Sequence, residues 1–248
     1  MSSDFKKYLN VYTFKCNLPG IEKEIEFKPI TTGELKKLLV YANDDDPERI
    51  EDALDNLVKS CVVTEDFNID DLYLQDRYYL LFEIRKKTKG ETYKFEFKCP
   101  KCNSQNIEII DLNNLKVVKL RDKESNNIVK LTDNLSIRMS NIIRGAQKEI
   151  YRKLRSLKKN DSQYNVDFSI YTISCGIVGI ITPDGEDNDI TLDDKKYLVE
   201  NIPTGLYEKI SDWYSDNNFG IIFEYDLKCK NCGYISEKSK IQMSDFFL

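Results

Sequence analysis

The chain has 248 residues, enough for one large domain or two smaller ones. It contains no histidine, which excludes Ser–His–Asp and Cys–His catalysis, HExxH metalloproteases and Cys/His zinc fingers. A formal net charge of −5 argues against a protein whose main task is to coat nucleic acid. No apolar run approaches the ~20 residues of a membrane span, and the first residues lack the apolar region of a secretory signal.

The N-terminal part is predicted to form a β-hairpin followed by three helices. Thr31 and Glu34 have the spacing of a capping box, and Asp46 is a candidate N-cap directly before Pro47. Gly90 follows a basic segment and is a candidate C-cap for the third helix. The strands are expected at residues 11–16 and 21–27, and the helices near residues 31–39, 46–61 and 70–88.

Four of the seven cysteines form two CxxC pairs. They are Cys99 with Cys102 and Cys229 with Cys232. Apolar and polar residues alternate before the pairs, at residues 93–98 and 223–228, and strand-like segments follow both pairs. Each pair is therefore predicted to lie at the tip of a β-hairpin. The residue after each pair, Asn103 or Gly233, tolerates the left-handed backbone that a tight metal-binding turn needs.

Four thiolates brought together would complete a tetrahedral zinc site with no open position, so the site would be structural. The 126 residues between the two pairs would make this a split zinc ribbon, assembled from two distant hairpins. Two independent redox pairs or plain thiols are the alternatives, but a redox CxxC normally opens a helix within a βαβ unit. The remaining cysteines lie in apolar surroundings and are interpreted as small core residues: Cys16, Cys61 and Cys175.

The segment between the two hairpins is predicted to be a mixed α/β insertion. Strands are expected near residues 116–120, 128–131 and 135–139, and helices near residues 147–158, 168–180, 192–201 and 206–214. The first of these helices is basic, and Lys153 and Arg155 are candidates for a polar contact surface, with a solvated face as the simpler interpretation. The sequence has no glycine-rich phosphate loop and no carboxylate pair at catalytic spacing, so we expect no enzyme.

The chain is therefore predicted to be an α+β protein in which a zinc site joins two distant segments. Residues 1–112 would contain the N-terminal hairpin, the helices and the first zinc hairpin. Residues 113–222 would form the insertion, and residues 223–248 the second zinc hairpin, which completes the first domain. We expect three apolar C-terminal residues to dock in a groove of this chain or of a partner: Phe246, Phe247 and Leu248.

Several short segments stand out when the chain is read in order. They are Leu18-Pro19-Gly20, residues 27–34, 57–61, 76–81 and 83–85, then Cys99-Pro100-Lys101-Cys102, Phe219-Gly220, Cys229-Lys230-Asn231-Cys232-Gly233 and a Phe-Phe terminus. This ordered set resembles the baseplate protein family of T4-like contractile-tailed phages, in particular the baseplate hub subunit and hub assembly proteins. The chain departs from the family pattern in one turn, where it has Leu-Pro-Gly in place of Leu-Pro-Ser-x-Gly.

The resemblance implies a late phage protein that is made in the host cytoplasm and helps to build the tail baseplate. It would either remain in the virion as a hub component or leave as an assembly factor. We expect one structural zinc and contacts with other baseplate and tail proteins, without nucleic acid, membrane or small-molecule substrate. The alternative is a zinc-ribbon regulator of late phage transcription, which would bind DNA or RNA with a strong salt dependence. A carboxylate-dependent metal hydrolase would need a magnesium or manganese ion for which the sequence offers no site.

Overall fold

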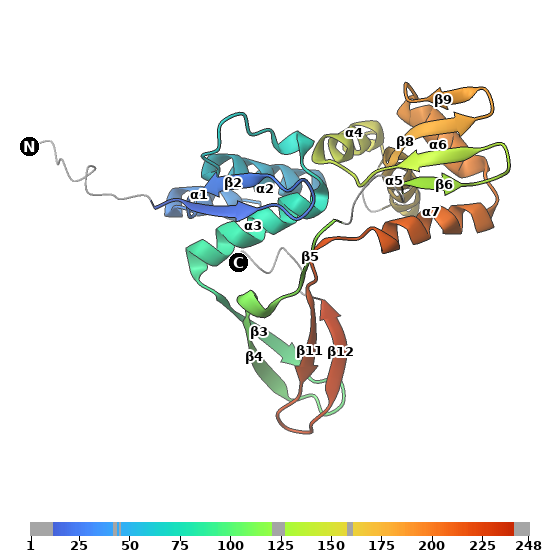
Figure 1. Cartoon of the computed structure of the whole chain (residues 1–248). Helices are drawn as coiled ribbons and strands as arrows, with labels where there is room; N and C mark the ends of the chain where they lie inside the picture. The colour runs from blue at the N-terminus through green and yellow to red at the C-terminus, as the bar shows by residue number, and fades with distance from the viewer. Residues whose placement is uncertain (1–11, 42–43, 45, 121–126, 158–160, 241–248) are drawn as a thin grey trace, which may run out of the picture.

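The computed structural model describes residues 12–41, 44, 46–120, 127–157 and 161–240. It confirms the α+β fold class, because helices combine with small antiparallel sheets. Figure 1 shows three parts: an N-terminal unit of a hairpin and helices, an arm made of two further hairpins, and an α/β part at the upper right. Among the described residues, no helix is both long enough and apolar enough to cross a membrane.

The N-terminal unit is a β-hairpin packed on helices. Thr31 and Glu34 form the predicted capping box, and the Asp46 side chain accepts a hydrogen bond from the N–H of Glu48. The elements are β1 (Phe14–Asn17), β2 (Glu24–Phe27), α1 (Thr32–Leu39), α2 (Pro47–Cys61), η2 (Ile69–Asp71) and α3 (Leu74–Lys89). Side chains from all of them form one apolar core, which includes Leu18, Ile25, Phe27, Leu57, Val58, Leu80, Leu81 and Ile84.

The third helix begins later than predicted, at Leu74 instead of near residue 70. The 3₁₀ turn η2 precedes it, and Tyr73 has an extended backbone that forms a β-bridge with Ile143. This bridge links the N-terminal unit to the α/β part, so the boundary depends on a residue 70 positions away in the chain. At the other end, Gly90 caps α3 with a φ of 97°, as predicted.

The Leu-Pro-Gly turn of the first hairpin is held by the start of α3. The buried carboxylate of Asp76 accepts hydrogen bonds from the backbone N–H groups of Gly20, at 2.7 Å, and Ile21, at 3.1 Å. A Cβ added at Gly20 would lie 2.5 Å from both Asp76 Oδ2 and the ring of Phe219. Three segments that are distant in sequence therefore meet at this turn, and only glycine fits between them.

Gly20→Ala is expected to lower the free energy of unfolding by about 1–3 kcal/mol, because the added methyl group must displace the Asp76 carboxylate or the Phe219 ring. Gly205→Ala is the matched control, since nothing lies within 4 Å of a Cβ there, and we expect it to change the free energy by less than ~1 kcal/mol. Urea unfolding of both variants measures the difference. Equal stabilities would contradict a tightly packed turn.

The α/β part contains a four-stranded antiparallel sheet in the order β6-β7-β8-β9, accompanied by helices. The chain enters and leaves this part through β5 and β10, which pair with each other. The elements are β5 (Val117–Val118), β6 (Ile128–Lys130), β7 (Ser136–Met139), α4 (Arg144–Leu154), α5 (Ser162–Cys175), β8 (Ile177–Thr182), β9 (Gly185–Asp187), α6 (Leu192–Asn201), α7 (Thr204–Asp216) and β10 (Gly220–Ile221). An apolar cluster distinct from the N-terminal core lies here and includes Ile137, Met139, Ile177, Ile210 and Trp213.

The prediction of a helix near residues 168–180 is wrong for the residues after Cys175. Helix α5 ends at Cys175, and the following residues form β8, which pairs with β7. At Gly176 the backbone packs so closely against Tyr214 that an added Cβ would lie 1.6 Å from its hydroxyl oxygen. The apolar run after this glycine pairs with β7 and is a strand, whereas a short apolar pattern alone does not distinguish a strand from a helix.

Buried charges lie where the N-terminal unit meets the α/β part. Arg77 of α3 and Arg144 of α4 are fully buried, and their Nε atoms lie 2.6 and 2.8 Å from the two carboxylate oxygens of Asp55 in α2. Glu51 lies 2.6 Å from Arg77, and Asp52 lies 3.0 Å from Arg144. Buried guanidinium groups require such partners, so this network is part of the joint between the two units.

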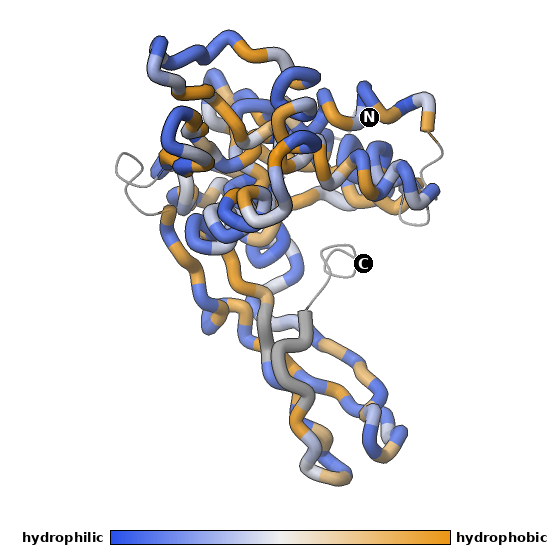
Figure 2. The backbone as a smooth tube through the Cα atoms, turned by 90° about the vertical axis from the view of Figure 1, so that its right-hand side faces the viewer, coloured by the Kyte–Doolittle hydropathy of each residue, from blue (hydrophilic) through white to orange (hydrophobic). Residues whose placement is uncertain are grey.

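The arm consists of two antiparallel hairpins that lie side by side (Figures 1 and 2). In the first hairpin, exposed and half-buried residues alternate along residues 92–98, as the sequence predicts. The base of the arm packs on α3, where the rings of Phe82 and Phe223 meet at a centroid distance of 5.8 Å. The elements of the arm are β3 (Thr92–Lys98), β4 (Gln105–Asp111), η3 (Leu112–Asn114), β11 (Glu224–Lys228) and β12 (Ile235–Lys240).

Candidate metal centre

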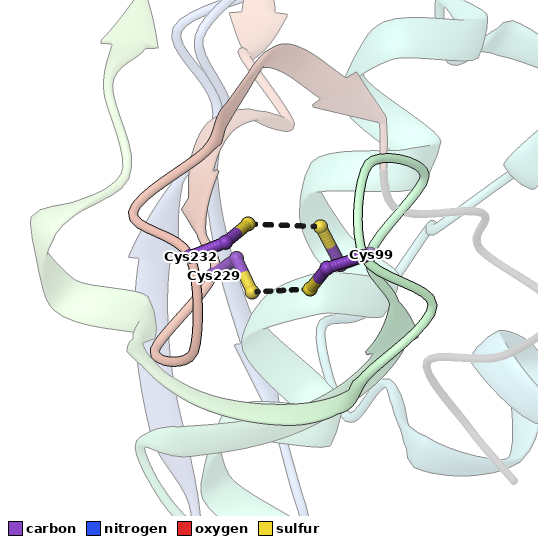
Figure 3. A group of neighbouring side chains, drawn as sticks. Cys99, Cys229 and Cys232 are labelled. Carbon is purple, nitrogen blue, oxygen red and sulfur yellow. Dashed lines mark hydrogen bonds between the residues drawn. The ribbon is translucent and has the colours of Figure 1, made fainter.

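The two CxxC pairs meet at the tip of the arm. The first pair lies in the turn between β3 and β4, and the second lies in the turn between β11 and β12. The Sγ atoms of Cys99 and Cys232 are 3.7 Å apart, as are those of Cys102 and Cys229 (Figure 3). All four sulfur atoms lie within 4.8 Å of one another. The predicted convergence of the two distant pairs is therefore confirmed.

The two cysteine turns have the same backbone geometry. The N–H of Asn103 donates to the carbonyl of Cys99, and the N–H of Gly233 donates to the carbonyl of Cys229, both at 2.9 Å. Asn103 has a φ of 59° and Gly233 a φ of 71°, so both adopt the predicted left-handed backbone. This shared geometry turns both sulfur atoms of each pair toward the facing hairpin.

Polar groups around Cys102 and Cys229 favour the thiolate form of these two residues. The Ser104 hydroxyl lies 3.0 Å from Cys102 Sγ and 3.3 Å from Cys229 Sγ. The side-chain amides of Asn106 and Asn231 donate to Cys229 Sγ and Cys102 Sγ, at 3.5 and 3.6 Å. Hydrogen bonding, first of all to Ser104, lowers the pKa of Cys229 to about 5 and the pKa of Cys102 to about 7. Thiolates are the form of cysteine that binds metal ions. At Cys232 the backbone of Tyr234 acts to lower the pKa, but hydrogen bonds with the other three sulfur atoms outweigh it and raise the pKa to about 12.

The cluster fits a tetrahedral metal ion. With metal–sulfur bonds of about 2.3 Å, four sulfur ligands at the corners of a tetrahedron lie roughly 3.8 Å apart. The observed separation of 3.7 Å within each facing pair matches this value. Since the four thiolates would fill all four positions, no place would remain for a substrate or a reactive water. The arrangement suits a structural role.

Asn106, which the sequence pattern does not single out, joins the two hairpins beside the cluster. This buried side chain accepts a hydrogen bond from the backbone N–H of Lys230 at 2.9 Å, in addition to its contact with Cys229. The Lys230 ammonium donates to the carbonyl of Ile107 at 2.8 Å. Asn106 has an ordinary place in an alternating strand, so its role becomes visible only when the second hairpin is positioned.

The other predicted site residues lie away from the cluster. Lys153 Nζ is 2.6 Å from a carboxylate oxygen of Asp193, and Arg155 Nη2 is 3.1 Å from Glu48. Both side chains therefore bind carboxylates of this chain, and their contact with a partner stays a prediction. The predicted C-terminal docking residues lie outside the described residues: Phe246, Phe247 and Leu248.

A pocket of about 500 Å³, which no sequence motif indicates, lies between α1 and α2. Its lining combines apolar side chains such as Leu38, Val40 and Leu57 with polar ones such as Asn56 and Ser60. Its lining residues are not those of the cysteine cluster, and no histidine is available to it. The pocket is therefore separate from the candidate metal centre.

One match with known proteins extends over nearly the whole chain. A family model described as T4 bacteriophage base plate protein matches residues 10–248. No curated protein and no solved structure matches the chain. The resemblance inferred from short segments near both ends thus extends through the middle of the sequence. The chain belongs to the T4 bacteriophage base plate protein family.

Proposed function

We propose that the protein is a structural or assembly protein of the baseplate hub region that contains one structural zinc ion and acts through protein–protein contacts. The observation that carries this proposal is the closed four-cysteine cluster in a chain of a baseplate family. A site of this kind stabilises a fold and leaves no position for chemistry. The proposal also treats residues 113–222 as an insertion between the two halves of a zinc-bound domain.

Zinc is the ion that we propose for the cluster. Four thiolates in a tetrahedral arrangement are typical of structural zinc or of iron–sulfur centres, and zinc brings no redox chemistry. When bound, the ion would tie the β3–β4 hairpin to the β11–β12 hairpin, which share no ladder of backbone hydrogen bonds. Assembly in the reducing host cytoplasm, which the family suggests, would keep these cysteines free of disulfides.

The proposed partner surface is based on two features of the sequence. One is the apolar C-terminus formed by Phe246, Phe247 and Leu248, and the other is the basic pair of Lys153 and Arg155. Because the basic pair already binds Asp193 and Glu48, a partner would have to compete with those carboxylates or bind all four groups together. The C-terminus is therefore the simpler candidate for a contact.

Quantitative mass spectrometry of purified tails and of infected-cell lysates tests the proposed role. A constant number of copies in purified tails would identify a component of the virion. Abundance in the lysate within tail subcomplexes, combined with absence from finished tails, would identify an assembly factor. A chain that associates with no tail protein in either sample would contradict the proposal. Salt-dependent binding to DNA or RNA would then favour a transcription regulator.

A further inference from the structure

Four lysines surround the metal centre at the tip of the arm. Each is a direct neighbour in sequence of a clustered cysteine: Lys98, Lys101, Lys228 and Lys230. All four side chains are exposed. Within the described part of the chain, none of them forms an ion pair with a carboxylate, whereas Lys94 on the same hairpin pairs with Glu96 at 2.6 Å. Convergence of the cysteines thus places four ammonium groups at one end of the molecule, none with a carboxylate partner among the described residues.

These charges exceed what the metal centre itself would neutralise. Four thiolates around a divalent cation carry a formal net charge of about −2, whereas the lysines contribute four positive charges. The tip is therefore positive on a chain whose formal net charge is −5. Clustered like charges at a protruding end disfavour the isolated molecule slightly and favour contact with an anionic surface.

Exposed aliphatic side chains lie next to the lysines. Ile107 is 43% exposed, and the Lys230 ammonium binds its carbonyl oxygen. Ile235 is 50% exposed and lies directly opposite Lys228 in the β11–β12 ladder. Ile109, two residues after Ile107 on the same face of β4, is 66% exposed. Apolar groups surrounded by charges are typical of protein interfaces.

We propose that this lysine tip, defined by Lys98, Lys101, Lys228, Lys230, Ile107 and Ile235, docks on an acidic and partly apolar surface of another baseplate protein. The proposal rests on the proposed baseplate function and adds the chemistry of the contact. A nucleic acid fits less well, because Tyr234 is the one exposed aromatic side chain that the cysteine turns contribute, and single strands bind to several stacked rings. The negative charge of the whole chain also opposes a long phosphate backbone.

Site-specific photo-crosslinking in infected cells tests the lysine tip. The full chain carries p-benzoyl-phenylalanine in place of Ile107, or in place of Val40, which is 76% exposed and belongs to the N-terminal unit. We expect the probe at position 107 to capture a baseplate protein through a peptide rich in Asp and Glu. Four Lys→Glu changes at the tip should reduce that capture at least about tenfold. The same changes at Lys23, Lys36, Lys59 and Lys116, which are also exposed, should leave it unchanged.

A second set of tip variants with Lys→Gln changes separates loss of contact from loss of the metal centre. These variants keep neutral side chains near the thiolates, and their metal content and circular dichroism must match those of the unchanged protein. Capture that persists in both tip variants would overturn the proposal. Capture of a baseplate protein at position 40 alone would also overturn the proposed docking of the tip, but it would leave the proposed baseplate function intact. If neither position captured a baseplate protein, the docking proposal and the proposed function would both be contradicted. If the probe at position 107 forms adducts with nucleic acid that depend on the four lysines, the partner of the tip is DNA or RNA and not an acidic protein surface.

Discussion

Cys229→Ser is expected to remove the metal ion and to separate the two hairpins of the arm. Cys229 Sγ lies 3.7 Å from Cys102 Sγ and also contacts Ser104 and Asn106, both of which belong to the other hairpin. A serine hydroxyl is a poor replacement for a thiolate ligand. Structural zinc contributes ~10–16 kcal/mol in small zinc domains, and we expect this variant to lose a substantial part of such a contribution.

Elemental analysis and hydrogen exchange measure this effect. We expect about one zinc per chain in the unchanged protein, near none in Cys229→Ser, and faster amide exchange along β3, β4, β11 and β12. Cys175→Ser is the matched control, because Cys175 belongs to the separate α4–α5 cluster and its Sγ contacts the carbonyl of Ala146. That variant should keep both the metal and the protection of the arm. Equal stability of metal-free and metal-bound protein would contradict a structural ion.

The cysteine cluster could be predicted because its signals are local. The spacing of the cysteines, the alternation before each pair and the residues Asn103 and Gly233 are all visible within segments of about ten residues. The expectation that the two pairs meet comes from coordination chemistry, because one thiolate pair supplies only two of the four ligands of a tetrahedral ion. The sequence therefore predicted a contact between residues that lie more than a hundred positions apart.

The joint between the N-terminal unit and the α/β part could not be predicted in this way. Asp55 occupies an ordinary position on an amphipathic helix, and Arg144 is one of several basic residues of a second amphipathic helix. The two residues are 89 positions apart in the chain, and their pairing depends on how the two units pack together. No local pattern distinguishes a charge that will be buried from one that stays in solvent. The boundary between α5 and β8 has the same origin, since tertiary pairing with β7 decides it.

Asp55 stabilises this joint because its carboxylate pairs with two buried arginines at once. Each of its oxygens lies within 2.8 Å of a different guanidinium, one from α3 and one from α4. Lys148 Nζ adds a third cation at 3.2 Å. A carboxylate shared by two units couples their positions, since neither arginine can leave it without exposing a buried charge to an apolar environment.

Asp55→Asn is expected to lower the free energy of unfolding by about 3–5 kcal/mol, because two buried guanidinium groups lose their shared ionic partner while the volume of the side chain is kept. Asp133→Asn is the control: its carboxylate is 96% exposed and pairs with Lys130, so a change below ~0.5 kcal/mol is expected. Urea unfolding at neutral pH measures both differences. A loss below ~1 kcal/mol for Asp55→Asn would contradict its role in the joint.

The pH dependence of the same variant separates the charge of Asp55 from its shape. Burial acts to raise the pKa of Asp55, but the guanidinium groups of Arg77 and Arg144 outweigh it and hold the pKa below its ordinary value. A carboxyl group with a lowered folded-state pKa stabilises the protein above the unfolded pKa of about 3.9 and loses this contribution as the pH falls through the folded value. The difference in unfolding free energy between the unchanged protein and Asp55→Asn should therefore be constant from about pH 5 to 7 and shrink below about pH 4. A difference that stays constant down to about pH 2 would mean that the amide destabilises the joint through its geometry, not through the missing charge.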